Sequence, residues 1–423
     1  MLISFIEKNK KEIFFILLLL LFFYRSPFIF LNGRFMAEEG SLYFANAYKF
    51  NFFYSLIFVD FTSGYLNLWA NISGIISNFF DLKFAPLISN YLALIPKIII
   101  IFIILYNKSL LFSKFEHKIL FCLLIFLSPA NVPEIWLNSI NSQIFFCIIT
   151  FILIFIIFDT NRINYYYLFL IFLAGLTGIY SCILLPIFFF KYLIYKHRQD
   201  FANLLTILSC TTVQLTLVLY AKLSNILYEE KLHSINFDLI VNYIYNVLIK
   251  AFLGTSLTKY IYNNLIIEIN LYILSAILIF LFFLLFIFFY NQLKSQISKN
   301  KKKKFVIFSC LYCLISTSLV VMVGGVSDYV GGRYAALPSF YLLAIILIFY
   351  NFFDKFRIKF FFLLLLFSSI LTGTYEFRPS NHYLNFLDCN GCPKWENEVV
   401  KFQKDKTYRL KIWPYPKKNM SLN

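Results

Sequence analysis

Long runs without a single charged residue are the feature that most constrains this chain. Four of them cover residues 13–23, 98–106, 271–290 and 360–367. A helix that crosses a bilayer needs about 20 predominantly apolar residues. Strands of a membrane barrel instead alternate apolar and polar residues and have no such runs. The runs therefore predict membrane-spanning helices.

Composition supports this interpretation. Hydrophobic residues make up 60% of the 423 residues and charged residues 14%, against about 45–50% and about 25% in soluble domains. A soluble enzyme is thereby excluded, and so is a disordered chain. In a soluble protein the net charge of +17 would suggest nucleic acid. In a membrane protein, Lys and Arg mark cytoplasmic loops instead, so we expect no nucleic-acid partner.

We predict an all-α bundle of about eleven spans with a cytoplasmic N-terminus and an outer C-terminus. The segments 119–131, 165–178 and 180–195 are short for a bilayer, and we expect half-helices or tilted hairpins beside a cavity. The spans cover 13–31, 84–106, 119–131, 143–158, 165–178, 180–195, 201–222, 269–290, 305–323, 335–351 and 358–375.

The distribution of basic residues sets the predicted orientation. The proposed inside segments hold 19 Lys and Arg, and the proposed outside loops hold 8. A transmembrane domain of residues 1–375 then has two long outer loops, 32–83 and 223–268. Residues 376–423 form an outer tail, which we expect to fold against those loops. Polar residues spaced along 65–80 predict helices that lie in the membrane interface.

The first outer loop begins with two adjacent carboxylates, Glu38 and Glu39. A carboxylate above a cavity at the membrane surface can act as a general base on an acceptor hydroxyl. Neighbouring residues on a helix differ by about 100°, so the two cannot face one point. The alternative is that both are solvated acids near a helix start, which the helix dipole favours.

With this acid pair the chain resembles GT-C glycosyltransferases, and more closely the bacterial glucosyltransferase-like membrane proteins akin to O-antigen-modifying enzymes. That family usually carries Asp where this chain has Glu, so the resemblance leaves open which Glu is the base. The similar pieces are Ala37-Glu38-Glu39-Gly40 with Ala45, Asn138 to Gln143, Leu176-Thr177-Gly178 with Pro186, Gly332-Arg333-Tyr334 with Pro338, and Ile412 to Pro416.

Further polar residues near the predicted outer surface complete the candidate site. Arg333 suits a donor phosphate, because an Arg fork binds phosphate bidentately; the alternative is an interface anchor. Arg25 is a second candidate for that phosphate, although it can also snorkel outward. Asn141 and Gln143 are expected to contact sugar hydroxyls. Lys97 lies deep in a predicted span, where an ionisable residue is functional by default.

The cysteines divide into two groups. Six lie in predicted spans and are expected to behave as small apolar residues. Cys389 and Cys392 lie in the tail, on the predicted oxidising side, and a local disulfide between them is expected. No metal-spaced His cluster is present in the sequence, and neither a metal nor a cofactor is expected.

These features together predict an inverting membrane glycosyltransferase. As the resemblance implies, it would move a sugar from a polyprenyl-phosphate donor to a cell-surface glycan or lipid-linked acceptor, on the outer face of a bacterial inner membrane. The bilayer is the remaining partner. The rival interpretations are a lipid-linked glycan flippase or other transporter, for which internal repeats are typical, and a glycan polymerase or ligase.

Overall fold

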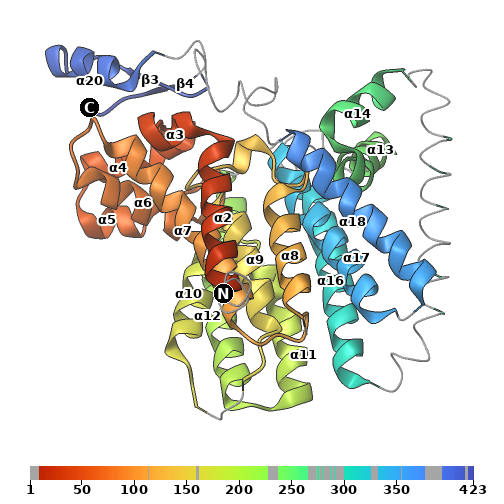
Figure 1. The fold of residues 1–423 in the computed structure, drawn as a ribbon. Coiled ribbons are helices and arrows are strands. Elements are labelled where there is room, and N and C mark those ends of the chain that lie inside the picture. The colour runs from red at the N-terminus through yellow and green to blue at the C-terminus, as the bar shows by residue number, and fades with distance from the viewer. Residues whose placement is uncertain are drawn as a thin grey trace.

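The computed structural model describes residues 9–112, 114–158, 162–226, 237–264, 300–324, 332–353, 355–376, 393–414 and 418–423, with five single positions between 273 and 291. The regular secondary structure of this part of the chain is helical apart from two short hairpins and a few isolated bridges (Figure 1). The predicted all-α class is confirmed. The predicted span 269–290 lies almost wholly outside the described residues.

Among the described residues, six helices are long and apolar enough to cross a membrane, by length and composition. The chain therefore has the architecture of a multi-pass helical membrane protein, as predicted. The six cover α7 (Ala85–Tyr106), α12 (Arg198–Leu223), the segment Asp238–Ile261, most of α16 (Lys301–Gly324), η6 (Gly332–Ala335) with α17 (Ala336–Phe352), and α18 (Phe356–Glu376).

Besides α2, four shorter apolar helices lie in the described part of the chain. Two of the segments predicted to be short are indeed α10 (Tyr165–Leu176) and α11 (Leu185–Tyr195), the latter preceded by η3 (Cys182–Leu184). The third, α8 (Phe115–Leu127), begins and ends earlier than predicted. Its C-cap, Ser128, is extended, because the residue before a proline is disfavoured in the helical region. The fourth is α9 (Ser142–Ile154).

The first predicted span is divided in two. The structure forms α2 (Lys10–Arg25) and α3 (Pro27–Asn32), with Ser26 non-helical at φ −154° and ψ 77°. Pro27 supplies the physical reason, since it restrains the residue before it and starts the next helix at N1. The break fixes the direction in which the chain leaves the bundle.

Part of the predicted outer loop 223–268 is helical, and its segment Asp238–Ile261 is long and apolar enough to cross a membrane, which the predicted loop did not anticipate. It forms α13 (Phe237–Tyr243), η5 (Ile244–Ile249) and α14 (Lys250–Asn264), with a break at Gly254, whose φ is +73°. A Cβ at Gly254 would lie 2.7 Å from Oε1 of Glu376. The glycine therefore lets α14 approach the end of α18, beside which it lies in Figure 1.

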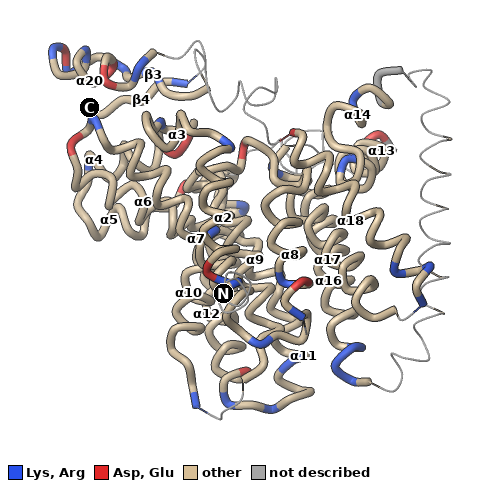
Figure 2. Tube along the Cα trace, in the orientation of Figure 1, with Lys and Arg blue, Asp and Glu red and all other residues tan. Residues whose placement is uncertain are grey.

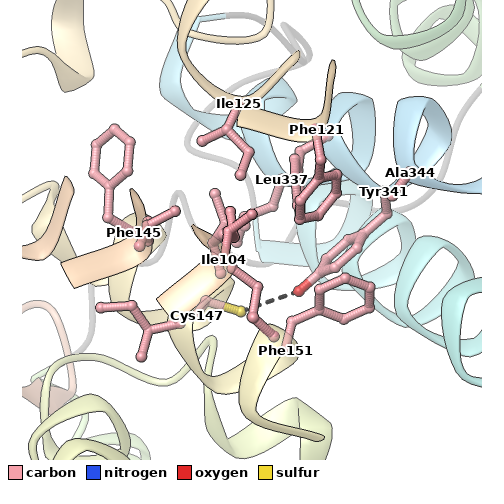
Figure 3. Close-up of a cluster of buried hydrophobic side chains, with 14 of the residues drawn as sticks. Ile104, Phe121, Ile125, Phe145, Cys147, Phe151, Leu337, Tyr341 and Ala344 are labelled. Carbon is pink, nitrogen blue, oxygen red and sulfur yellow. Dashed lines mark hydrogen bonds between the residues drawn. The ribbon is translucent and has the colours of Figure 1, made fainter. Parts of the chain in front are cut away.

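The apolar core is built around α9 and α17. All thirteen residues of α9 are buried. In the candidate span Gly332–Phe352, which contains α17, 83% of an 18-residue stretch is buried, against 22% in the span formed by α18. Figure 3 shows the centre of this core, where Tyr341 of α17 and Cys147 of α9 share a hydrogen bond of 3.3 Å. The helices with low burial, such as α12 and α18, expose apolar side chains suited to lipid.

The helix ends gather at two opposite ends of the bundle. At one end, here called the basic end, α2 begins beside α8, with Lys10 over the ring of Phe115 and Lys118 donating to the carbonyl of Asn107. Figure 2 shows Lys and Arg at this end of several helices, including the Lys301–Lys304 run. The other end, here called the loop end, carries the first outer loop and the tail.

At the loop end, residues 33–84 form the loop that the sequence predicts to be the first outer loop, and the name is kept below; it holds only short elements. These are η1 (Glu39–Phe44), α4 (Ala45–Lys49), α5 (Phe52–Leu56), the antiparallel strands β1 (Val59–Asp60) and β2 (Tyr65–Leu66), and α6 (Leu68–Asn78).

The described part of the tail consists of α20 (Trp395–Lys404) and the antiparallel strands β3 (Leu410–Ile412) and β4 (Lys418–Met420). Its apolar residues share a small second core with the first outer loop, in which Phe35 and Phe44 meet Phe402 and Ile412. Met36 also forms a bridge with Trp413. The tail thus folds against the first outer loop, as predicted.

Candidate functional site

The two adjacent carboxylates have opposite environments. Glu39 is only 2% exposed. Its Oε1 accepts hydrogen bonds from Ser89 Oγ at 2.7 Å and from Ser139 N and Oγ at 2.9 and 2.7 Å. Its Oε2 accepts from Met36 N at 3.1 Å. Burial raises the pKa of Glu39, and the hydrogen bonds oppose that rise. With these partners, Glu39 joins the first outer loop to α7 and to the turn before α9.

Glu38 is the accessible member of the pair. Its side chain is 38% exposed, and its Oε1 lies 3.0 Å from Nζ of Lys418 in β4. A general base needs an oxygen that an acceptor hydroxyl can reach. Glu38 meets this requirement, whereas the oxygens of Glu39 are enclosed by their donors. The geometry therefore gives different environments to two residues that the sequence left equivalent.

Close packing explains the residues that flank the pair. Ala37 has a φ of +47°, and its N–H donates to the carbonyl of Trp413 at 2.6 Å. A Cβ at Gly40 would lie 2.8 Å from Cβ of Phe35 and 3.3 Å from Ile412. Only a glycine allows this approach without a shift. The Ala37–Gly40 motif is thus shaped by the tail as well as by the loop.

Asp60 is a third carboxylate of this region, and the sequence analysis missed it. It ends β1 and accepts from Thr62 N, Thr62 Oγ1 and Ser63 Oγ at 3.1, 2.7 and 2.6 Å. Burial raises the pKa of Tyr43, and the charges of Tyr65, Asp60 and Glu38 raise it further. Asp60 and Glu38 therefore lie within electrostatic reach of one buried hydroxyl. The Asp-x-Thr-Ser turn pattern was the signal that could have found Asp60.

A second polar cluster forms around Arg333. Its Nε lies 3.6 Å from Oε1 of Glu134, whose other oxygen accepts from Arg333 N at 3.1 Å. Both side chains remain about one-third exposed. Arg333 also donates to the hydroxyl of Tyr334 at 3.3 Å. The guanidinium is paired, but part of its surface can still meet a ligand.

Tyr65 in β2 connects this cluster to the first outer loop. Its hydroxyl accepts from Nε2 of Gln143 at 3.3 Å. Burial raises the pKa of Tyr65, while the hydrogen bond from Gln143 and the charge of Arg333 lower it. The predicted residues Gln143 and Arg333 therefore come together at one tyrosine, and Asp60 acts on it as well.

Asn141 has an indirect position in this cluster. Its amide donates to the backbone carbonyl of Glu134 at 3.0 Å. It thereby supports η2 (Pro133–Ile135), which presents Glu134 to Arg333. The expected contact of Asn141 with a sugar hydroxyl stays a prediction.

Arg25 lies in a small pocket of its own. Its Nη2 donates to the carbonyl of Asn131 at 2.6 Å, and the guanidinium lies 4.3 Å over the ring of Trp136. The pocket offers only about 20 Å³, and its lining includes Thr255 and Glu376 but not Arg333. The structure therefore does not bring the two predicted phosphate ligands into one cavity.

An alternating row of charges nevertheless runs across the loop end. The charge of Glu376 acts on Arg25, and the charges of Glu376 and Glu134 both act on the buried Lys250. Glu134 in turn pairs with Arg333. The five residues belong to five separate elements. The row holds three cations against two carboxylates, so it carries an excess positive charge.

Lys97 is fully buried in α7. Its ammonium donates to the carbonyl of Ala93 at 3.0 Å and lies 3.9 Å over the ring of Phe145 and 5.5 Å from that of Trp136. Aromatic faces attract cations when both are desolvated. The charge of Arg25 also acts on Lys97. The sequence had offered no partner for this residue.

Two other predictions concern cysteines and metals. Cys389 and Cys392 lie outside the described residues, while Cys122, Cys147, Cys182, Cys210, Cys310 and Cys313 are free thiols. Among the residues with described positions, His, Cys, Asp and Glu form no group of three that could hold a metal ion.

Comparison of the chain with protein-family models, with curated proteins and with solved structures finds no match. Function must therefore be argued from the geometry of the loop end alone.

Proposed function

We propose that this protein is an inverting, metal-independent membrane glycosyltransferase of GT-C type. Its donor is a polyprenyl-phosphate sugar, and its acceptor is a cell-surface glycan or a lipid-linked glycan. The reaction takes place at the loop end, on the outer face of a bacterial plasma membrane. The observation that carries the proposal is an accessible carboxylate, Glu38, fixed on a buried polar framework at the outer rim of an apolar bundle.

In the proposed reaction Glu38 takes the proton of the acceptor hydroxyl. The acceptor oxygen attacks the anomeric carbon, and the bond from that carbon to the phosphate oxygen breaks. The polyprenyl phosphate leaves with the electron pair. Arg333 stabilises the charge on the leaving phosphate, because a guanidinium pairs with phosphate through charge-assisted hydrogen bonds. The tyrosine and amide side chains around Arg333, Tyr65 and Gln143 suit the orientation of sugar hydroxyls.

The proposed topology has about eleven spans, an inside N-terminus and an outside C-terminus. The gathering of Lys and Arg at the basic end supports it, because cytoplasmic loops carry an excess of these residues. An alkaline phosphatase fused after Asn423 should be active, and one fused after Asn300 inactive. The opposite pair of results would place the acid pair in the cytoplasm and end the proposal.

The two glutamates provide a matched test of the chemistry. Purified protein would be given a polyprenyl-phosphate sugar and a lipid-linked acceptor, and the transferred sugar measured. Glu38→Gln should abolish transfer at unchanged thermal stability, whereas Glu39→Gln should retain a measurable rate and lose stability. Full transfer by Glu38→Gln would show that the base is elsewhere. Translocation of the lipid-linked glycan without any transfer would favour the flippase instead.

A further inference from the structure

A groove lies between the tail and the loop end of the bundle. None of the five residues of the charge row lines this groove. The groove has a volume of about 250 Å³ and lies between α3, the residues just before α7, and the tail. Its lining includes Leu31, Phe84, Lys394 and Lys411. Trp395 forms its edge and donates from Nε1 to the carbonyl of Leu82 at 2.9 Å. The groove is therefore bounded by two parts of the chain that dock on one another.

The lining of the groove combines apolar and basic side chains. Its apolar part includes Phe28, Leu31 and Phe84, which are exposed by 43%, 65% and 50%. Its basic part consists of Arg34, Lys83, Lys394 and Lys411, against Glu396 as the one acid in the lining. Glu396 already pairs with Lys83 at 3.1 Å. The groove thus carries an excess of positive charge beside exposed hydrocarbon.

The position of the groove relates this chemistry to the membrane. Lys83 and Phe84 directly precede the candidate span Ala85–Tyr106, and Leu31 lies near the end of α3, which continues α2. Aromatic and basic residues at such a point are typical of the bilayer interface, where basic pockets bind lipid head groups. A soluble anion would leave the exposed apolar side chains in water.

We propose that this groove binds the phosphate headgroup of an anionic glycerophospholipid from the surrounding leaflet. The phosphate lies against Lys394 and Lys411, and an acyl chain runs over Leu31 and Phe84. The bound lipid ties the tail to the membrane surface, and this role does not depend on the proposed reaction.

The test measures lipid retained by the full-length protein in mild detergent, by native mass spectrometry. Dioleoyl phosphatidylglycerol and dioleoyl phosphatidylethanolamine are added separately, and glycerol phosphate is added as a soluble competitor. Wild-type protein should retain phosphatidylglycerol preferentially. Lys394→Gln with Lys411→Gln should weaken retention about tenfold or more, since each basic residue near a membrane surface contributes substantially to anionic-lipid affinity.

The matched control is Lys404→Gln with Lys406→Gln, which removes the same charge from the same tail outside the groove lining. It should retain the lipid as wild type does. Leu31→Ser tests the apolar part from a different element, and should weaken retention about fivefold or more because it removes chain contact. Leu31→Ser decides the matter if the double Lys variant does not fold.

Three outcomes would overturn the proposal. Equal retention of the two phospholipids would show that the groove does not distinguish headgroups by their charge. An equal loss of lipid retention in both double Lys variants would show a general electrostatic attraction to the tail and no specific site in the groove. Displacement of phosphatidylglycerol by an equal concentration of glycerol phosphate would show a soluble-anion site without a lipid contribution.

Discussion

Two ion pairs at opposite ends of the bundle show how differently one kind of contact can be used. At the basic end, Lys191 and Asp200 lie 2.8 Å apart, with side chains 4% and 1% exposed. Lys191 also donates to the carbonyl of Ile156 and lies over the ring of Phe158. At the loop end, Arg333 and Glu134 lie 3.6 Å apart and remain about one-third exposed.

The difference separates a structural contact from one that can change partner. A fully enclosed pair has given up its water, and neither charge can leave without a large penalty. A pair that keeps part of its hydration loses little when a ligand replaces one partner. The first pair therefore fastens α11 to α12, and the second leaves a guanidinium ready for an anion.

The largest expected effect concerns Glu38, the accessible carboxylate of the adjacent acid pair. Glu38→Gln removes the proton acceptor, and the rate of sugar transfer should fall about 10²- to 10⁴-fold. The unfolding temperature should stay at the wild-type value, because the side chain is partly exposed. Transfer assays and thermal unfolding of the same preparation check both statements. If the unfolding temperature of Glu38→Gln fell together with its transfer rate, Glu38 would have a structural role, as is expected of Glu39.

Substitutions in the enclosed pair, Lys191 and Asp200, should change the stability of the protein. Asp200→Asn leaves Lys191 buried without its counter-charge, so the free energy of unfolding should fall by about 3–5 kcal/mol. The control is Lys191→Met with Asp200→Leu, which removes both charges and should cost much less. Denaturant unfolding of reconstituted protein measures the difference. If the single and double variants were equally stable, the tight pair would be no more structural than the loose one.

The loose pair should respond through ligand binding. Arg333→Ala removes a charge-assisted contact and should weaken donor binding about 10- to 100-fold at unchanged expression. Arg333→Lys keeps the charge without the fork, so it should fall between Ala and wild type. Donor titration of the transfer rate gives the order. Full activity of the Lys variant would mean that Arg333 only anchors its helix at the interface.

The smallest effect is expected at Glu39, which resembles the enclosed pair although it lies at the loop end. Glu39→Gln cannot accept from both Ser139 and Met36 in one orientation, and should cost about 1–3 kcal/mol of unfolding free energy. Burial raises the pKa of Glu39. The stability that Glu39 contributes through this shift is therefore fully present below the ordinary carboxyl pKa. It is lost as the pH rises through the raised pKa of Glu39 in the folded protein. Unfolding curves across this range should flatten in the Gln variant.

The sequence predicted the features that are local in the chain. Uncharged runs located α7, α12, α16, α17 and α18, because helices must satisfy their own backbone hydrogen bonds in lipid. The acid pair was found because it follows the first apolar run directly. The break at Ser26 also had a local signal, Pro27, which the length of the run concealed.

The rest of the site depends on contacts between distant segments. The charge row joins residues 25, 134, 250, 333 and 376, and none of them predicts the others from its own surroundings. The need for a glycine at position 254 is explained by the close approach of Glu376, which lies far away in the sequence. The choice between Glu38 and Glu39 depends in part on Lys418, which is 380 positions away. Adjacent identical residues cannot be told apart by local pattern.

The contact between the first outer loop and the tail has a consequence for the order of synthesis. Met36 and Glu38 precede the six candidate spans found among the described residues, and their partners Trp413 and Lys418 follow all six. The loop must therefore wait, with part of its small core uncovered, until every intervening helix has been inserted. A chain released early carries its acid pair without Lys418 beside it. Completion of the candidate site thus reports that the helices between these two segments have been made and inserted.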